Sequence, residues 1–174
     1  MNNTINFNEL FSQIRLSSYN NDIVKHYDNL KCVGKITPKL ATLEIILRNK
    51  LDNKLSEKDN DWIKNSNDEK IKKSKEEIEH REKNRILSHH QYLSRISLGT
   101  IIHLIKENKL QNSIMDLKNI NFRNYNQYNR NFFFENGIKT TKIKNTHIGV
   151  DPQKIDFFLS DLIKTFNEKI LEYC

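Results

Sequence analysis

The stretch LATLEIILRNKLDNKL, residues 40–55, decides the fold class of this chain. Its leucines recur at spacings of three and four residues, which places them on one side of an α-helix; they are Leu40, Leu43, Leu47, Leu51 and Leu55. Thr37 is predicted to cap the start of this helix, with Pro38 at its first position. A charged series with a four-residue spacing runs along a different side of the helix: Glu44, Arg48 and Asp52.

The composition of the whole chain favours helices joined by short connections. Only four of the 174 residues are glycine and two are proline, which is too few chain breakers for a β-sandwich or a propeller. Hydrophobic residues make up 36% of the chain and charged residues 29%, so one core can form. We expect a single all-α domain, a helical bundle over residues 1–174.

Further elements are predicted on both sides of the leucine helix. Ser88 and Gln91 form a capping-box pattern at the start of a helix over residues 89–105. That helix is apolar nearly all round, so we expect it in the middle of the bundle. A final helix is predicted to open at Asp151-Pro152. Shorter elements are predicted at residues 7–14, 19–33 and 110–115 as helices, and at 140–150 as an extended segment.

Residues 56–85 differ from the rest of the chain because they are strongly polar. Lys and Glu are dense between residues 68 and 83, which is typical of a solvated helix supported by pairs of opposite charge four residues apart. We therefore expect a polar, charged arm or a protruding helix at about 56–85. The segment offers few side chains to a core: Trp62, Ile63, Ile71 and Ile78.

The net charge of +7 permits a nucleic-acid partner without requiring one. The isoelectric point is about 9.3, a value that suits RNA or DNA binding. However, Asn, Lys and Ile together account for 68 of the 174 residues, and an AT-rich coding sequence also produces that composition. Part of the basic charge can therefore be a consequence of codon usage.

Targeting and cofactor signals are missing from the sequence. Cys32 and Cys174 show neither metal-ligand spacing nor a disulfide framework. The start of the chain lacks a signal-peptide pattern, and the longest apolar stretch, residues 96–105, is too short to span a bilayer. No glycine-rich phosphate loop, nucleophile elbow or zinc signature is present. We expect a cytoplasmic protein with no membrane association, no cofactor and no metal site.

Two residue pairs could carry chemistry. Arg85 lies five positions before His90; in helical ribonucleases an arginine can stabilise the phosphorane charge while a histidine moves the proton of the ribose 2′-OH. The alternative is a solvated arginine and a histidine near a helix cap. Arg48 and Asn49 could face a cleft and contact a phosphate or a base edge, whereas the alternative is an ordinary salt-bridged helix side.

A third candidate is the aromatic and basic stretch over residues 122–132. Tyrosines and phenylalanines alternate there with arginines, and unpaired RNA bases stack on such side chains. The alternative is that these aromatic rings pack into the bundle.

Three segments, taken in order, resemble the Abi-like (abortive infection) family of bacterial proteins. Residues 40–55 resemble its LE-x-x-LRN-x-(I/L) helix, and residues 89–105 resemble its LSFGFW helix around Leu98-Gly99. Residues 132–166 resemble its Glu-Asn stretch and its final IGI-x-P-x-KI helix. The family is all-α and is assigned to the HEPN superfamily, many members of which are ribonucleases or RNA-binding partners in phage defence and toxin–antitoxin systems. The resemblance implies a HEPN-like fold and a role of that kind.

The sequence departs from the R-x-x-x-x-H motif that is the hallmark of the superfamily. When Glu135-Asn136 is matched to the family's Glu-Asn, Phe133 stands at the position of the histidine and Tyr128 at that of the first arginine. Phenylalanine can neither transfer a proton nor bind phosphate, so the motif is degenerate or deleted. The residues that the resemblance assigns to an RNA-binding cleft are Glu44, Arg48, Asn49, Arg130, Glu135 and Asn136.

We therefore expect an Abi-like protein of the phage-defence or toxin–antitoxin type that binds RNA without the family's catalytic pair. Two alternatives stay open. One is an active HEPN-type ribonuclease that uses another pair such as Arg85 and His90. The other is a helical protein-interaction module with no nucleic-acid role. The partners to consider are RNA, a second copy in a homodimer, and an antitoxin or other partner protein.

Overall fold

The expectation of an all-α fold is confirmed. The computed structural model describes residues 7–83, 85–118, 120–121, 124–125 and 154–174, and every regular element among these residues is helical. In chain order the elements are α1 (Phe7–Phe11), α2 (Gln13–Ser17), α3 (Ile23–Ser56), α4 (Trp62–Asn65), α5 (Glu69–Arg81), α6 (His89–Arg95), α7 (Leu98–Glu107), α8 (Gln111–Ile114), α11 (Ile155–Lys164) and the 3-10 helix η2 (Glu168–Tyr173).

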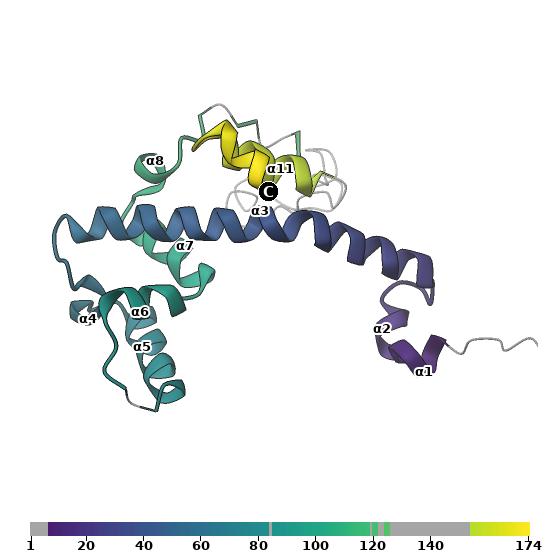
Figure 1. Cartoon of the computed structure of the whole chain (residues 1–174), viewed down its shortest axis with the longest axis horizontal. Coiled ribbons are helices and arrows are strands. Elements are labelled where there is room, and N and C mark those ends of the chain that lie inside the picture. Colours follow the sequence, from purple (N-terminus) through teal and green to yellow (C-terminus); the bar gives the residue numbers. More distant parts are fainter. Residues whose placement is uncertain (1–6, 84, 119, 122–123, 126–153) are drawn as a thin grey trace, which may run out of the picture.

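Helix α3 is the axis along which the other elements are arranged (Figure 1). Helices α7, α8 and α11 pack against it, and α1 and α2 lie beside its N-terminal end. The predicted leucine side faces the core at Leu43, Leu47 and Leu51, and Leu55 packs against the edge of that core. Leu40 is 42% exposed, so the buried part of the leucine side begins one turn later than the sequence predicts.

The prediction of separate helices over 19–33 and from Thr37 onward is wrong, because α3 runs continuously through Pro38. Asp22 caps the start of α3 by accepting hydrogen bonds from the backbone N–H groups of Val24 and Lys25. Thr37 is an interior residue, and its hydroxyl donates to the carbonyl of Val33 at 2.7 Å. Proline costs the helix one hydrogen bond, and the packing of the C-terminal half of α3 holds the helix together despite that loss.

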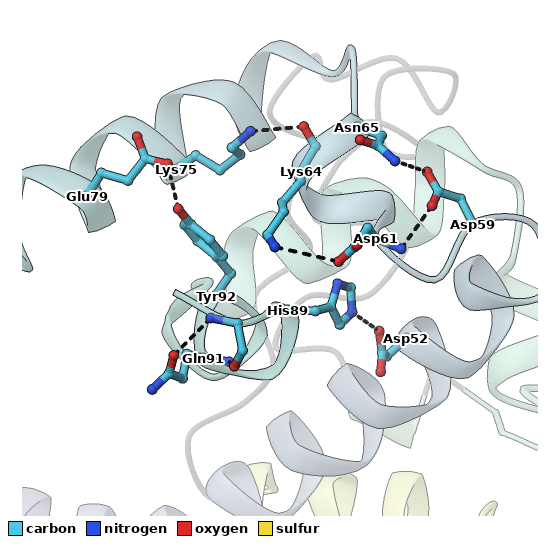
Figure 2. Close-up of polar contacts among 11 residues, drawn as sticks. Asp52, Asp59, Asp61, Lys64, Asn65, Lys75, Glu79, His89, Gln91 and Tyr92 are labelled. Atoms are coloured by element: carbon cyan, nitrogen blue, oxygen red, sulfur yellow. Dashed lines mark hydrogen bonds and ion pairs between the residues drawn. The ribbon is translucent and has the colours of Figure 1, made fainter. Parts of the chain in front are cut away.

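The four apolar residues of the polar segment 56–85 are all buried. Trp62 and Ile63 lie on α4, while Ile71 and Ile78 lie two turns apart on one side of α5. Two side chains also join α5 to α6: the Tyr92 hydroxyl donates to Glu79 at 2.6 Å (Figure 2), and Arg95 pairs with Glu82, which follows α5. The charged side of α5 faces solvent, as its composition predicts, while its apolar side belongs to the common core.

The helix predicted over 89–105 is divided into α6 and α7. Ser88 and Gln91 form the predicted capping box at the start of α6, but the chain leaves the helix at Ile96, which is 2% exposed. The Ser97 hydroxyl then accepts from the backbone N–H of Thr100 and begins α7. The expectation that this region is buried all round is wrong, since Ile102 is 51% exposed.

The ends of the chain also differ from the prediction. The first helix is divided at Ser12, whose φ is 61°, into α1 and α2. The last helix ends at Lys164, and η2 follows after the cap residue Asn167. The short helix expected at 110–115 is present as α8. The predicted opening at Asp151-Pro152 and the extended segment at 140–150 lie outside the described residues.

Candidate functional site

The charged side of α3 forms a polar network with side chains of α4 and α6 and with the backbone carbonyl at the end of α6. We call the side chains of Glu44, Arg48, Asp52, Trp62 and His89, with the carbonyl of Ile96, the α3 polar network. Figure 2 shows His89 reaching from α6 to Asp52 on α3. The network lies where α3, α4 and α6 meet, so each of its bonds joins two elements or closes one turn of α3.

Asp52 holds the Trp62 and His89 members of the network. Its Oδ1 accepts hydrogen bonds from the indole Nε1 of Trp62 at 2.9 Å and from Nε2 of His89 at 2.7 Å. Burial alone would raise the pKa of Asp52, but the hydrogen bonds from His89 and Trp62 outweigh it and hold that pKa below its ordinary value. The carboxylate is therefore ionised at neutral pH and ties α4 and α6 to α3.

The geometry of His89 fits a structural clamp better than a general base. Nε2 donates to Asp52, which leaves Nδ1 as the nitrogen that could accept a proton from a substrate. Nδ1 is fully buried and has no hydrogen-bond partner among the described residues. The ring packs edge-on against Trp62, with 5.7 Å between the ring centroids. A base must reach the proton it removes, and this nitrogen is not exposed to solvent.

Arg48, predicted as an RNA contact, is used inside the protein. Its side chain is 16% exposed, and Nη2 donates to Glu44 at 2.5 Å and to the carbonyl of Ile96 at 3.1 Å. Ile96 is the residue at which α6 ends, where exposed carbonyls attract a cation. Arg48 therefore stabilises the junction between α6 and α7, and its Nη2 is not available to a phosphate. Asn49, the next residue, is exposed.

Arg85 and His90 lie on opposite sides of the cap that begins α6. Both residues are exposed. Arg85 lines a small cavity of about 220 Å³ together with Lys64, Glu79, Ile86, Leu87 and Tyr92, and His90 is not among the residues that line it. The ring of His90 lies instead beside that of His89, with 5.7 Å between their centroids. The cavity at Arg85 is therefore not one in which this arginine and His90 could act on one phosphate.

The remaining predicted contacts lie mostly outside the described residues. These are Arg130, Glu135 and Asn136, together with Phe133 at the motif position. Of the aromatic and basic stretch, Tyr125 is described: its hydroxyl donates to Asp161 of α11, and its ring lies 5.2 Å from that of Phe158. That hydrogen bond raises the pKa of Tyr125 and lowers the pKa of Asp161.

A polar cavity of about 550 Å³ lies beside this contact. Two carboxylates, one amine and several amide or hydroxyl groups line it: Asp116, Asn121, Asn124, Tyr125, Asp161, Lys164 and Thr165, with Ile120 as the apolar member. Both oxygens of Asp161 are engaged, by Tyr125 and by Lys164. The ring of Tyr125 thus packs on α11. For this residue the structure agrees with the alternative that the aromatic rings pack into the bundle rather than stack on RNA bases.

Neither a metal centre nor a membrane span is found in the described part of the chain. No three or more His, Cys, Asp or Glu side chains there are grouped so that they could hold a metal ion. Among the same residues, no helix combines the length and the apolar character needed to cross a bilayer.

Comparisons with known proteins identify no relative: no family model, no curated protein and no solved structure matches this chain. Sequence reasoning missed the roles of His89 and Trp62. The one available signal was Trp62 itself, a large aromatic residue in a polar segment ten positions after Asp52.

Proposed function

We propose that this chain is an Abi-like protein that binds RNA and lacks the family's ribonuclease pair. The observation that carries the proposal is the uneven distribution of charge. Residues 84–153 contain ten Lys and Arg against four Asp and Glu, a net charge of +6, whereas the rest of the chain contains 19 against 18, a net charge of +1. Almost the entire net charge of +7 thus lies in one continuous stretch, which also holds the aromatic and basic residues 122–132.

Codon usage does not account for this segregation. An AT-rich coding sequence enriches lysine, but lysine is sparser in residues 84–153, with six in 70 residues, than in the rest, with 16 in 104. The excess arises because acidic residues are few and because four of the seven arginines lie there. Arginine pairs with phosphate in a bidentate manner and stacks on bases, so this composition suits an RNA surface.

The described cations of this stretch are available to a ligand. Arg95 pairs with Glu82. Four other cations of the stretch are exposed: Arg85, Lys106, Lys109 and Lys118. None of these four has a carboxylate oxygen of a described residue within 4.0 Å of its charged nitrogen. By contrast, Lys54, Lys64 and Lys72 in the preceding segment each pair with an acidic side chain three residues away. Unpaired cations gain the most from phosphate and release counterions when RNA binds.

The closed geometry of the α3 polar network supports the non-catalytic part of the proposal. His89 has the carboxylate partner that a general base needs, but its other nitrogen is buried. His90 has solvent access, but it does not line the cavity that Arg85 lines. Binding rather than cleavage is therefore the activity that these residues favour.

The test measures the affinity of the purified chain for labelled single-stranded RNA and tRNA by fluorescence anisotropy across a salt series. One variant removes the unpaired cations by substitution to Gln: R85Q, K106Q, K109Q and K118Q. A matched control removes the same number of exposed charges from residues 57–83: K58Q, K70Q, K73Q and K83Q. For single strands we expect the salt slope to fall by about 0.7 per lost phosphate contact in the first variant and to stay unchanged in the control.

Two results would contradict the proposal. Equal loss of affinity in both variants would show that only overall charge matters, and absence of salt-dependent binding would leave no role for phosphate. The same RNA is examined for cleavage with wild-type protein and H90A. Cleavage that disappears in H90A would overturn the non-catalytic part and favour the ribonuclease alternative.

A further inference from the structure

Exposed apolar side chains concentrate at the N-terminal end of the molecule. Helices α1 and α2, with α3 up to Ile45, form what we call the N-terminal arm (Figure 1). Nine large apolar residues of the arm are between 39% and 85% exposed: Phe7, Leu10, Ile14, Val24, Tyr27, Leu30, Val33, Leu40 and Ile45. Exposed apolar patches of this extent mark interaction surfaces.

The arm has little core of its own. Among the described residues before Leu43, Leu16 and His26 are buried, and the rings of Phe11 and Tyr19 pack on His26 with centroid distances of 5.3 and 5.2 Å. Neither buried residue belongs to the main core cluster, whose first buried member along the chain is Leu43. An arm that buries so few side chains would gain stability from any further apolar contact.

One side of α3 forms a continuous uncovered line within the arm. Its residues are separated by three or four positions, and all are exposed: Leu30, Gly34, Thr37, Ala41 and Ile45. We call this line the α3 stripe. A Cβ placed on Gly34 would meet no atom within 4 Å, so nothing in the described structure explains a glycine there. Pro38 adds a second feature, because it has no N–H and leaves the carbonyl of Gly34 without its usual donor.

We propose that the α3 stripe is the contact between two copies of this chain, paired antiparallel about a two-fold axis near Thr37 and Pro38. The order of residues along the stripe matches itself when reversed. With the axis there, Leu30 of one copy faces Ile45 of the other, and Gly34 faces Ala41. Large side chains meet at both ends of the contact. Small residues at its centre let the two helix axes approach to about 8–10 Å, the usual distance between packed helices.

The exposed apolar area reaches that of a stable dimer when α1 and α2 also take part in the contact. At roughly 180 Å² for each fully exposed residue, the six exposed apolar residues of α3, which include Leu30 and Ile45 of the stripe, offer roughly 540 Å² per copy, and the three on α1 and α2 add roughly 350 Å². A standard stable interface takes about 800 Å² from each partner. The stripe runs from Leu30 to Ile45, which is about 22 Å of helix, and the exposed side chains of α1 and α2 lie beyond its N-terminal end.

The charge of the arm permits self-association. Residues 7–45 contain five Lys and Arg and four Asp and Glu, a net charge of +1. The basic excess of the chain lies in residues 84–153, away from the stripe in the sequence. Two of the arm's lysines also pair within α3, Lys25 with Asp22 and Lys31 with Asp28, so two copies meet with little repulsion. A highly acidic partner would find no matching charge on this surface.

The test uses sedimentation velocity of the RNA-free full-length chain from about 1 to 100 µM. We expect a concentration-dependent dimer in the wild type and at least about a tenfold weaker association in L30E and in I45K, since each buries an unpaired charge in the contact. Mixing L30E with I45K should restore association, because position 30 of one chain faces position 45 of the other. I102E is the matched control, since Ile102 is also half exposed (51%) but lies on α7.

The outcomes separate the alternatives. A wild-type chain that stays monomeric at 100 µM overturns the proposal and leaves the arm to a different protein. A dimer that survives L30E and I45K, or that I102E weakens equally, places the contact elsewhere. Weakening without rescue in the mixture overturns the antiparallel register. Circular dichroism checks the fold of each variant. Hydrogen exchange of the wild type tests the proposal without any variant, because protection of the backbone amides of residues 23–45 must rise with protein concentration.

Discussion

Replacement of Asp52 by alanine is the sharpest test of the α3 polar network. The substitution removes the acceptor of three hydrogen bonds, a long one from the Ser56 hydroxyl and those from Trp62 Nε1 and His89 Nε2, and leaves the last two donors without a partner. Both side chains are largely buried, with Trp62 7% exposed and the His89 side chain 11% exposed. A buried unsatisfied donor costs about 1–3 kcal/mol, so we expect the free energy of unfolding to fall by about 3–4 kcal/mol. That is a large share of the roughly 5–15 kcal/mol of a typical domain.

Urea denaturation followed by circular dichroism measures this loss, with D61A as the matched control. Asp61 is also an aspartate near α4, but its side chain is 56% exposed and it lies 3.8 Å from Lys64, so removing it should cost less than about 0.5 kcal/mol. A loss below about 1 kcal/mol in D52A, or an equal loss in both variants, would refute the conclusion that Asp52 ties α4 and α6 to α3.

The pH dependence of stability tests the same carboxylate. Its pKa is lower in the folded protein than the ordinary value of 3.8, so the unfolded chain binds the proton more readily. The stabilisation is therefore fully present above about pH 5 and is lost as the pH falls through the folded pKa. The difference in unfolding free energy between wild type and D52N should shrink as the pH falls below about 4. A difference that grows on acidification would contradict the assignment.

Three further substitutions test the fold. I63A should cost about 2–5 kcal/mol, because Ile63 is fully buried, while I86A, at a residue 98% exposed, should leave the urea midpoint unchanged; equal effects would mean that α4 does not belong to the core. S97A should cost about 1 kcal/mol by removing the cap of α7, measured by thermal denaturation against S97T, which keeps the hydroxyl. P38A should raise the melting temperature, since it supplies the missing donor to Gly34; a lower melting temperature would show that α3 requires the proline.

The candidate site was predictable in part. The four-residue spacing of Glu44, Arg48 and Asp52 correctly identified one charged side of α3, because neighbours on a helix follow from spacing alone. Its partners come from elsewhere in the chain: His89 lies 37 residues after Asp52, and the carbonyl of Ile96 lies 48 residues after Arg48. A backbone carbonyl carries no residue-specific signal, so the sequence could suggest an RNA contact for Arg48 while the fold engages it internally.

The errors in the predicted elements share a physical cause. Local preference placed a helix start at Thr37-Pro38, but packing of the following turns against α7 and α11 outweighs the loss of one hydrogen bond at Pro38. Local apolar character predicted one helix over 89–105, but burial of Ile96 and capping by Ser97 divide it. In both cases contacts between distant segments outweigh local preferences of about 1–3 kcal/mol.

The sequence by itself determined the all-α class, the leucine side of α3, the capping box at Ser88 and the concentration of positive charge in residues 84–153. These features depend on composition and on spacings of a few residues. In a helix with about 3.6 residues per turn, such spacings determine which residues share a side and where the helix begins and ends. Only the tertiary structure decided that Asp52 holds Trp62 and His89, that Arg48 is engaged at the end of α6, and that the arm keeps an exposed apolar side. Those outcomes depend on which helices pack together, because burial is a property of the neighbours that the whole chain brings to a residue.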